Sequence, residues 1–335
     1  MAALTRSLPA SWFREKSIHA LERKAVFLPV SQLNDFGSRY RATDLTTAFQ
    51  AWTLIGPVTR FAVDKSIERE IAGARITVTE NAGDYSVVNG KQQILPVHVT
   101  KSGLIFAALT PSAPGFEEYF YGLNELVDKV DFTKLPHRRS LSYEGHFNWK
   151  TMVDGYQECL HCTYTHRAFS ARYPITSYAV HNHGNFSQHI ADPDYPDDGL
   201  FMYFFPNCTL NVYGGGMSSF RVCPTENPTV TRMEFDYYHE SDGQEFEEYF
   251  SFVRRVALED FELCETAQEN LERGIYSQGI LNPVKEVGVS HYQQLVRKLV
   301  IVKYKEEHTS RLEGNSSLGH EVTTAGKLLP GAILA

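Results

Sequence analysis

The sequence predicts an α+β fold in which antiparallel strands pack against long helices. Short β-rich runs, separated by Gly, Asn and Asp turns, occur in the first third of the chain and again beyond residue 200. An amphipathic stretch then predicts a long helix over residues 243–273, ended by Gly274, and a further helix over residues 290–306. Runs of strands followed by runs of helices are typical of the α+β class.

The first predicted domain, residues 1–110, is mostly β after a short N-terminal helix. Ile18, Leu21 and Ala25 are spaced as on one helix face, which predicts a helix over residues 17–26. Strands are expected at residues 52–56, 74–79, 95–100 and 104–109. A polar, helical stretch at residues 116–129 then leads into the second domain.

The second predicted domain, residues 111–308, carries the candidate chemistry. A helix is expected around residues 148–161, and the three glycines from Gly214 to Gly216 predict a tight turn. Strands are expected at residues 201–205, 208–213, 218–222 and 229–238. Beyond residue 308 the chain shows little periodicity, so residues 309–335 are predicted to be a flexible tail.

Composition limits the classes of partner. The chain has 335 residues, of which 42% are hydrophobic and 21% charged, as expected of a globular protein. A net charge of −8 without a long basic run argues against nucleic acid and anionic membranes, and favours small molecules or proteins. The sequence shows no apolar run long enough for a signal peptide or a membrane span, so a cytoplasmic location is expected. Five cysteines, an odd and sparse set, favour reduced thiols.

One short segment holds a candidate metal site. His161 and His166 offer two imidazoles there, and Glu158 offers a carboxylate. Two imidazoles and one carboxylate on one face of a metal are typical of mononuclear iron sites that react with oxygen. A spacing of five places the two histidines about 140° apart on an ideal helix, so they converge only if the helix ends or bends between them. The alternative is a pair of helix-end histidines satisfied by ordinary hydrogen bonds.

Asp260 is the best candidate for a third ligand. Val256, Phe261 and Cys264 mark a buried helix face, and Asp260 lies beside it. The neighbouring acids are expected to face solvent, namely Glu259, Glu262 and Glu265. The alternative is that Asp260 is one more acid on a solvated face.

Cys159 and Cys162 form a C-x-x-C within the same segment. Such a pair can be redox-active or half of a zinc site. The sequence lacks a second pair at zinc-site spacing, and a helix interior is the expected context, so buried structural cysteines are the favoured interpretation. His181, His183 and His189 are expected on a loop or at a strand edge.

Several motifs across residues 140–305 occur in one family's order. They are Asn148-Trp149-Lys150, Glu158-Cys159-Leu160-His161-Cys162 with His166, Phe205-Pro206-Asn207, Arg221-Val222-Cys223-Pro224, and Glu259-Asp260 with Leu263-Cys264-Glu265 and Gln268. This set resembles the Rieske-type non-heme iron, aromatic-ring-hydroxylating oxygenase alpha subunits, and within them the choline monooxygenase-like branch. The resemblance implies a helix-grip (START-like) catalytic domain with an antiparallel sheet and a long C-terminal helix, preceded by a truncated β-rich Rieske-like domain.

The resemblance also implies roles for individual residues. His161, His166 and Asp260 match the family's iron ligands, which implies an Fe(II) cofactor. Glu158 matches the catalytic acid that links the iron to the cluster of a neighbouring subunit, which in turn implies a homotrimer. At Gly155 this chain departs from the family, which usually has an Asn there. The hydrogen bond that an Asn side chain could supply is therefore lost.

The family's electron donor is not expected in this chain. A Rieske [2Fe-2S] cluster needs two cysteines and two histidines, but no cysteine precedes Cys159. Family-like sequence stops near Gly90 and resumes near Ile94, as if the cluster-binding segment were excised, whereas residues 29–49 look like an insertion. Electrons would then come from a reductase, a cluster-bearing oxygenase partner or the substrate.

Three functions remain open at this point. The leading hypothesis is an iron oxygenase that uses O2 for hydroxylation, demethylation or a related oxidation. The second is a non-redox metal enzyme, and the third is an impaired auxiliary subunit of a complete oxygenase. The resemblance suggests a small amine as substrate, contacted by aromatic faces such as those of Tyr203, Phe205 or Tyr213, and an apolar natural product is the alternative.

Overall fold

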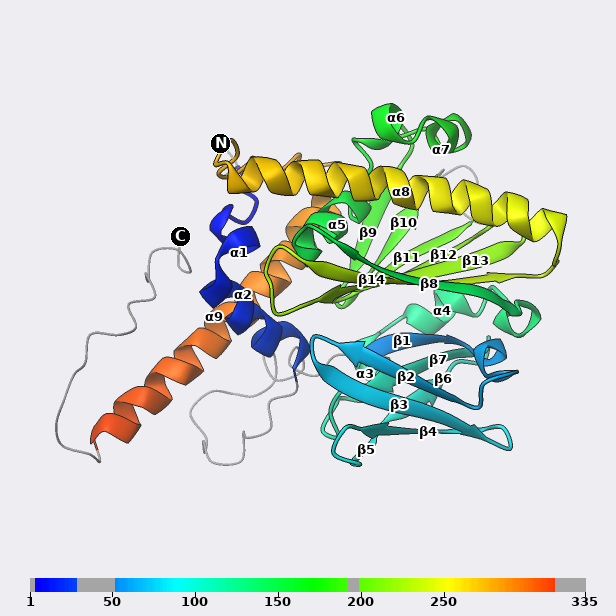
Figure 1. The fold of residues 1–335 in the computed structure, drawn as a ribbon, viewed down its shortest axis with the longest axis horizontal. Helices are drawn as coiled ribbons and strands as arrows, with labels where there is room; N and C mark the ends of the chain where they lie inside the picture. Colours follow the sequence, from blue (N-terminus) through cyan, green and yellow to red (C-terminus); the bar gives the residue numbers. More distant parts are fainter. Residues whose placement is uncertain (1–3, 29–51, 192–198, 317–335) are drawn as a thin grey trace.

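A seven-stranded antiparallel sheet forms the middle layer of the protein (Figure 1). The computed structural model describes residues 4–28, 52–191 and 199–316. The sheet has the order β8-β14-β13-β12-β11-β10-β9. Its strands are β8 (His137–Gly145), β9 (Ala179–His183), β10 (Phe186–Ile190), β11 (Leu200–Phe204), β12 (Cys208–Tyr213), β13 (Gly216–Pro224) and β14 (Thr231–His239).

Helices cover one face of this sheet. The longest described helices are α8 (Gln244–Glu272), which crosses the sheet, and α9 (Val287–Ser316), which runs away from one edge (Figure 1). Three shorter helices lie next to the candidate site, namely α5 (Trp149–Tyr156), α6 (Cys162–Thr165) and α7 (Arg167–Arg172). The N-terminal helices α1 (Ser11–Arg14) and α2 (Lys16–Glu22), with the π-helical turn Arg23–Phe27, pack against α8 and α9.

The opposite face of the large sheet meets the β-rich N-terminal part. This part contains a three-stranded sheet, β1-β7-β6, and a four-stranded sheet, β2-β3-β4-β5. The strands are β1 (Trp52–Pro57), β2 (Ser66–Ile71), β3 (Ala74–Asn81), β4 (Asp84–Asn89), β5 (Ile94–Leu95), β6 (Val97–Val99) and β7 (Leu104–Ala108). The short helices α3 (Phe116–Tyr119) and α4 (Leu123–Val127) follow.

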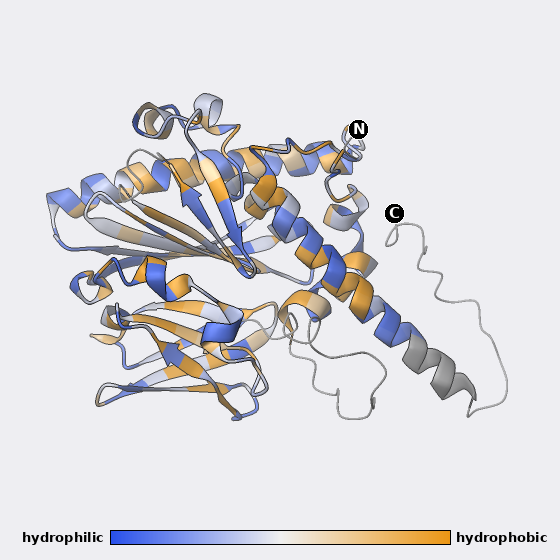
Figure 2. Cartoon of the chain, turned by 180° about the vertical axis from the view of Figure 1, so that it is seen from behind, coloured by the Kyte–Doolittle hydropathy of each residue, from blue (hydrophilic) through white to orange (hydrophobic). Residues whose placement is uncertain are grey.

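Successive side chains of the central strands pack on opposite faces of the large sheet. In β11, Met202 and Phe204 face the N-terminal sheets, whereas Tyr203 packs in the core on the helical side. Both faces of this strand are therefore covered, and all five of its residues are buried. Figure 2 shows hydrophobic residues along the strands and a mixture of polar and apolar residues along α8. The large sheet is thus a shared wall between the two halves of the protein.

The predicted tight turn after β12 is confirmed. Tyr213 pairs with Gly216, so Gly214 and Gly215 alone form the loop. Their φ angles of 60° and 76° are both left-handed, which a two-residue hairpin turn of this kind requires and glycine readily adopts. The turn fixes the register that places Asn211 and Ser218 side by side on the helical face of the sheet.

Some predicted element boundaries are wrong. The helix expected to run to residue 161 ends at Tyr156, and the helical stretch at 116–129 is interrupted at Gly122, whose φ is 83°. The predicted start of the tail at residue 309 lies inside α9, which continues to Ser316. The rest of that tail and the insertion predicted at 29–49 lie outside the described residues. None of the helices described has the length and apolar character needed to cross a bilayer.

Candidate metal centre

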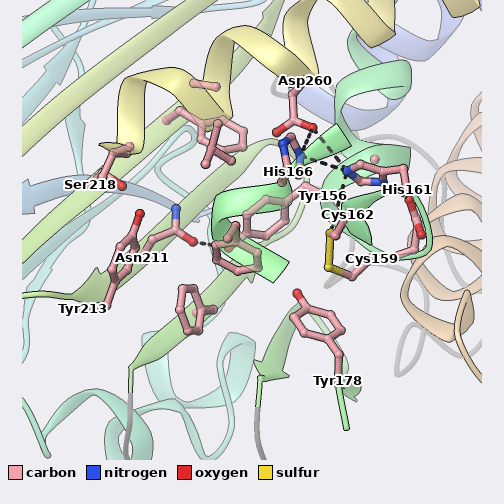
Figure 3. A pocket seen from close by; sticks show the side chains of 18 of the residues that line it. Tyr156, Cys159, His161, Cys162, His166, Tyr178, Asn211, Tyr213, Ser218 and Asp260 are labelled. Atoms are coloured by element: carbon pink, nitrogen blue, oxygen red, sulfur yellow. Dashed lines mark hydrogen bonds and ion pairs between the residues drawn. A yellow bond between two sulfur atoms is a disulfide. The ribbon is translucent and has the colours of Figure 1, made fainter. Parts of the chain in front are cut away.

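His161, His166 and Asp260 converge on one point (Figure 3). The Nε2 atoms of the two histidines lie 3.2 Å apart, and Asp260 Oδ1 lies 2.9 Å from His166 Nε2 and 3.3 Å from His161 Nε2. Two imidazole nitrogens and one carboxylate oxygen form the donor set of a two-histidine, one-carboxylate facial triad. The structure therefore brings together the three residues predicted as ligands, and their chemistry fits a divalent iron ion.

The two histidines can face each other because no continuous helix contains both of them. The chain leaves α5 at Tyr156 and turns before α6, so that His161 lies immediately ahead of α6. His166 ends α6 and precedes α7, with φ −104° and ψ 62°, outside the helical region. Because neither histidine lies inside a continuous helix, both rings can face the same side, as the spacing argument required.

Asp260 points inward because it continues an apolar stripe of α8. Val253, Val256, Ala257 and Asp260 follow the spacing of neighbours on one helix face, and all four line the same cavity. The carboxylate is the polar end of this stripe, next to the histidines. The prediction that Asp260 faces inward is confirmed.

Two further carboxylates hold the outer nitrogens of the imidazoles. Glu158 Oε1 contacts His161 Nδ1, and Glu259 Oε2 accepts a hydrogen bond from His166 Nδ1 at 2.8 Å. A carboxylate on the outer nitrogen fixes the ring and its tautomer, so that Nε2 faces the metal position. The expectation that Glu259 faces solvent is wrong, because its side chain, 32% exposed, is turned toward the His166 ring.

The imidazoles and carboxylates of the site shift one another's pKa values. Burial disfavours the charged form of His161, but Asp260 and Glu158 outweigh it and raise the pKa of His161 to about 10. The pKa of His166 is also raised, against burial, mainly by Asp260. Although burial opposes ionisation of Asp260, the two imidazoles lower the pKa of this carboxyl group. The surrounding carboxylates thus favour positive charge at this point of the site.

The expectation of five reduced thiols is wrong for two of them. Cys159 and Cys162 are joined by a disulfide, with their Cα atoms 5.1 Å apart. Cys159 lies in the turn between α5 and α6, and Cys162 is the first residue of α6, so neither lies in the helix interior that was expected, and the turn brings their sulfurs together. The other cysteines, Cys208, Cys223 and Cys264, are free and buried.

A cavity of about 110 Å³ lies beside the cluster, between the large sheet and α8. Aromatic side chains form a large part of its wall, namely those of Tyr156, Phe169, Tyr178, Phe201, Tyr213, Phe220 and Phe235. Asn211 and Ser218 supply polar groups on the sheet side, and Tyr156 donates a hydrogen bond to Asn211 Oδ1 at 2.7 Å. Of the aromatic residues predicted to contact substrate, Tyr213 lines this cavity, whereas Tyr203 and Phe205 belong to the core.

His189 supports the cavity wall from behind, whereas His181 and His183 are exposed on the edge strand β9. Burial lowers the pKa of His189 to about 3, so the ring is neutral. Its Nε2 lies 2.8 Å from Gln157 Oε1, which only accepts, so Nε2 carries the proton and Nδ1 accepts from the Tyr178 hydroxyl at 2.6 Å. The lone pairs of the Tyr178 oxygen are then available to the cavity that Tyr178 lines (Figure 3).

Comparison with known proteins gives a family match. The model of the ring hydroxylating alpha subunit catalytic domain matches residues 132–192 and 182–301. The carnitine monooxygenase oxygenase subunit of Escherichia coli (strain K12) is 27% identical over 248 residues, which is 66% of this chain and 65% of that protein. The chloroplastic choline monooxygenase of Spinacia oleracea is 25% identical over 170 residues, or 47% of this chain and 38% of that protein.

Solved structures share the fold. The quaternary ammonium Rieske monooxygenase CntA in complex with L-carnitine superposes with a TM-score of 0.70 at 17% identity, covering 88% of this chain and 96% of that one. Naphthalene 1,2-dioxygenase from a Rhodococcus species superposes with a TM-score of 0.62 at 12% identity, covering 88% and 94%. The present chain nevertheless spans slightly less than two thirds of the length of its E. coli relative.

Proposed function

Because the chain belongs to the family of ring-hydroxylating alpha subunits, we propose that it is a mononuclear non-heme Fe(II) oxygenase. His161, His166 and Asp260 would hold the iron, and their convergence within hydrogen-bonding distance is the observation that carries the proposal. Bound iron would supply O2 activation for hydroxylation, demethylation or a related oxidation of a small organic substrate.

The remaining residues of the site orient and charge the ligands. Glu158 and Glu259 hold the outer nitrogens, which keeps both Nε2 atoms directed at the metal position. Binding a cation requires neutral imidazoles, so a metal ion competes with protons for the Nε2 atoms of His161 and His166. Glu158 is also proposed as the catalytic acid through which the site communicates with an electron donor, as the family resemblance implies.

A small quaternary or tertiary amine is the proposed substrate. The cavity is small and aromatic, and aromatic faces attract alkylammonium groups. Tyr178 adds an oxygen whose lone pairs favour a positively charged or hydrogen-donating ligand. The relatives named as carnitine and choline monooxygenases support the same class of substrate.

The proposed reaction needs an electron donor, and the family resemblance suggests how the chain assembles. We propose that a reductase or a cluster-bearing oxygenase serves as redox partner, and that the chain assembles as a homotrimer like the family it resembles. A [2Fe-2S] cluster is not expected in this chain, because the sequence has no cysteine before Cys159.

Iron binding tests the proposal directly. The purified full chain, loaded anaerobically with Fe(II) and desalted, is expected to retain about one iron per chain by metal analysis. The double variant with His161→Ala and His166→Ala is expected to retain almost none, because it keeps only one of the three donors. His181→Ala is the matched control, since that histidine is exposed on β9.

Two results would contradict the proposal. One is wild-type protein without stoichiometric iron, and the other is iron retained equally by the double variant. Product formation from an amine under strict anaerobiosis would instead support a non-redox metal enzyme.

A further inference from the structure

The Cys159–Cys162 disulfide forms part of the wall of the metal-site cavity (Figure 3). Both cysteines line this cavity, and they are only 5% and 4% exposed. Cys162 Sγ lies 4.0 Å from His161 Nε2, the nitrogen that points at the metal position. The sulfur pair is therefore in direct contact with the space in which O2 would react.

The cysteine pair is next to a proposed metal ligand in the sequence. His161 lies between the two cysteines, inside the loop that the disulfide closes. The other three cysteines do not line the cavity, and burial raises the pKa of each thiol, that of Cys223 to about 12. Cys159 and Cys162 are thus the cysteines whose sulfurs lie at this site.

The proposed reaction needs what a dithiol provides. Monooxygenation consumes two electrons and two protons beyond O2 and the substrate C–H bond. Two thiols that become a disulfide release two electrons and two protons. The cysteines that hold the cluster in the family have no counterpart before Cys159. Cys159 and Cys162 are the cysteines that lie near the site in this chain.

We propose that Cys159 and Cys162 are a redox-active pair that supplies the two electrons for O2 reduction in this cavity, an inference that rests on the proposed oxygenase function. The substrate C–H, one O2 and the two thiols give the C–OH product, one water and the disulfide. The reductase proposed above as redox partner would carry a dithiol, which then reduces the disulfide by thiol–disulfide exchange and is itself oxidised to a disulfide. The structure corresponds to the oxidised state of this cycle.

Thiol counting on the intact chain tests the proposal. The protein is reduced with dithiothreitol, desalted anaerobically, loaded with Fe(II) and exposed to O2, with and without choline as the probe substrate. Free thiols, counted after denaturation, are expected to fall from five to three per chain, with peptide mapping placing the new disulfide at Cys159 and Cys162. Without choline the same step yields one hydrogen peroxide per chain. Thiol loss is expected to be roughly ten-fold slower when Fe(II) is left out and a chelator is added.

Matched variants separate the pair from other thiols. Cys159→Ser and Cys162→Ser are each expected to keep about one iron per chain, because the three proposed ligands remain. Neither variant can form this disulfide, so neither should lose two thiols. Cys264→Ser, which changes a buried cysteine of α8 outside the cavity, is expected to lose two thiols as the wild type does.

Failure of this inference differs from failure of the proposed function. Protein that binds no iron overturns both. Protein that binds iron but keeps all its thiols after O2 exposure overturns the redox role alone. Thiol loss at the same rate without Fe(II), or a disulfide that resists dithiothreitol in the native protein, also overturns it. The wild-type counts decide these cases even where a variant does not fold.

Discussion

His166 lies between two carboxylates that come from consecutive residues of one helix. Glu259 contacts Nδ1 at 2.8 Å, and Asp260 Oδ1 lies 2.9 Å from Nε2. Successive helical residues point about 100° apart, so the two acids reach the ring from different directions. The imidazole is therefore oriented before any metal binds, which lowers the cost of organising the site.

Removing the charge of Glu259 is expected to weaken metal binding. Glu259→Gln keeps an oxygen that accepts from His166 Nδ1, but the neutral amide makes the ring a weaker ligand. We expect Fe(II) affinity to fall by about 10–100-fold, as is typical for such outer partners. Anaerobic Fe(II) titration measures this, with Glu262→Gln as control because Glu262 is exposed on the same helix. Equal affinities for Glu259→Gln and the wild type would contradict the assigned role.

Asp154 is a second acid whose environment matters. Its Oδ1 accepts hydrogen bonds from Tyr292 and from Gln293 Nε2, the latter at 2.6 Å, which joins α5 to α9. Burial raises the pKa of this carboxyl group to about 7, despite these hydrogen bonds. The carboxyl group is therefore neutral at pH values where an exposed aspartate is charged.

The raised pKa of Asp154 predicts a stability difference between the wild type and an Asp154→Asn variant that depends on pH. A group whose pKa is raised in the folded state contributes fully to stability at pH values below its pKa in the unfolded chain, which is near 3.8 for Asp154. This contribution is lost as the pH rises through the folded-state pKa of about 7. Asp154→Asn keeps the accepting Oδ1 and does not ionise. The variant is expected to match the wild type near pH 4 and to be more stable by roughly 1–3 kcal/mol at pH 8. Urea unfolding at pH 4, 6 and 8 measures the difference, and parallel pH profiles for the two proteins would contradict it.

Elements far apart in the sequence are joined by a buried ion cluster. Asp236 of β14 contacts Arg221 of β13 at 2.6 Å and Arg69 of β2 at 3.1 Å. It also accepts a hydrogen bond from Ser140 of β8 at 2.6 Å. Burial opposes its ionisation, but the two guanidinium groups hold the pKa of Asp236 well below its usual range. The cluster thus connects the four-stranded sheet to the large sheet.

Breaking this cluster is expected to be costly. Asp236→Asn leaves two guanidinium groups without their shared carboxylate, and loss of one partner in a buried pair typically costs about 3–5 kcal/mol. Urea denaturation at pH 7 measures the loss. Arg75→Gln is the control, because the side chain of Arg75 is 74% exposed and its contact with Glu70 is worth about 1 kcal/mol or less. A similar small effect for both variants would show that the cluster does not stabilise the protein.

At the scale of the whole molecule, the sequence predicted what depends on local patterns. The α+β class, the helix over residues 243–273 and the glycine turn follow from spacing and turn chemistry, and the structure contains all three. The inward direction of Asp260 was also predictable, because it lies beside an apolar stripe of the same helix. The division into domains at residue 110 remains a prediction.

The features that were missed depend on contacts between distant segments. Glu259 looked like a solvent-facing acid because its partner, His166, lies in another element. The disulfide was missed because a count of cysteines over the whole chain favoured reduced thiols, whereas the turn after α5 decides the distance between Cys159 and Cys162. The strands β9 and β10 lack a strong alternating pattern, and the pairing of β10 with β11 and of β9 with β10 depends on the assembled sheet.

The alternation of the central strands also bears on how this protein can change over evolution. In β12, Asn211 and Tyr213 line the cavity, while Leu210 packs in the core on the opposite face. Phe220 of β13 likewise lines the cavity, while Met217 lies in that core. Alternate residues of the same strands thus line the cavity and pack the core, so substitutions can reshape the cavity wall and leave the core unchanged.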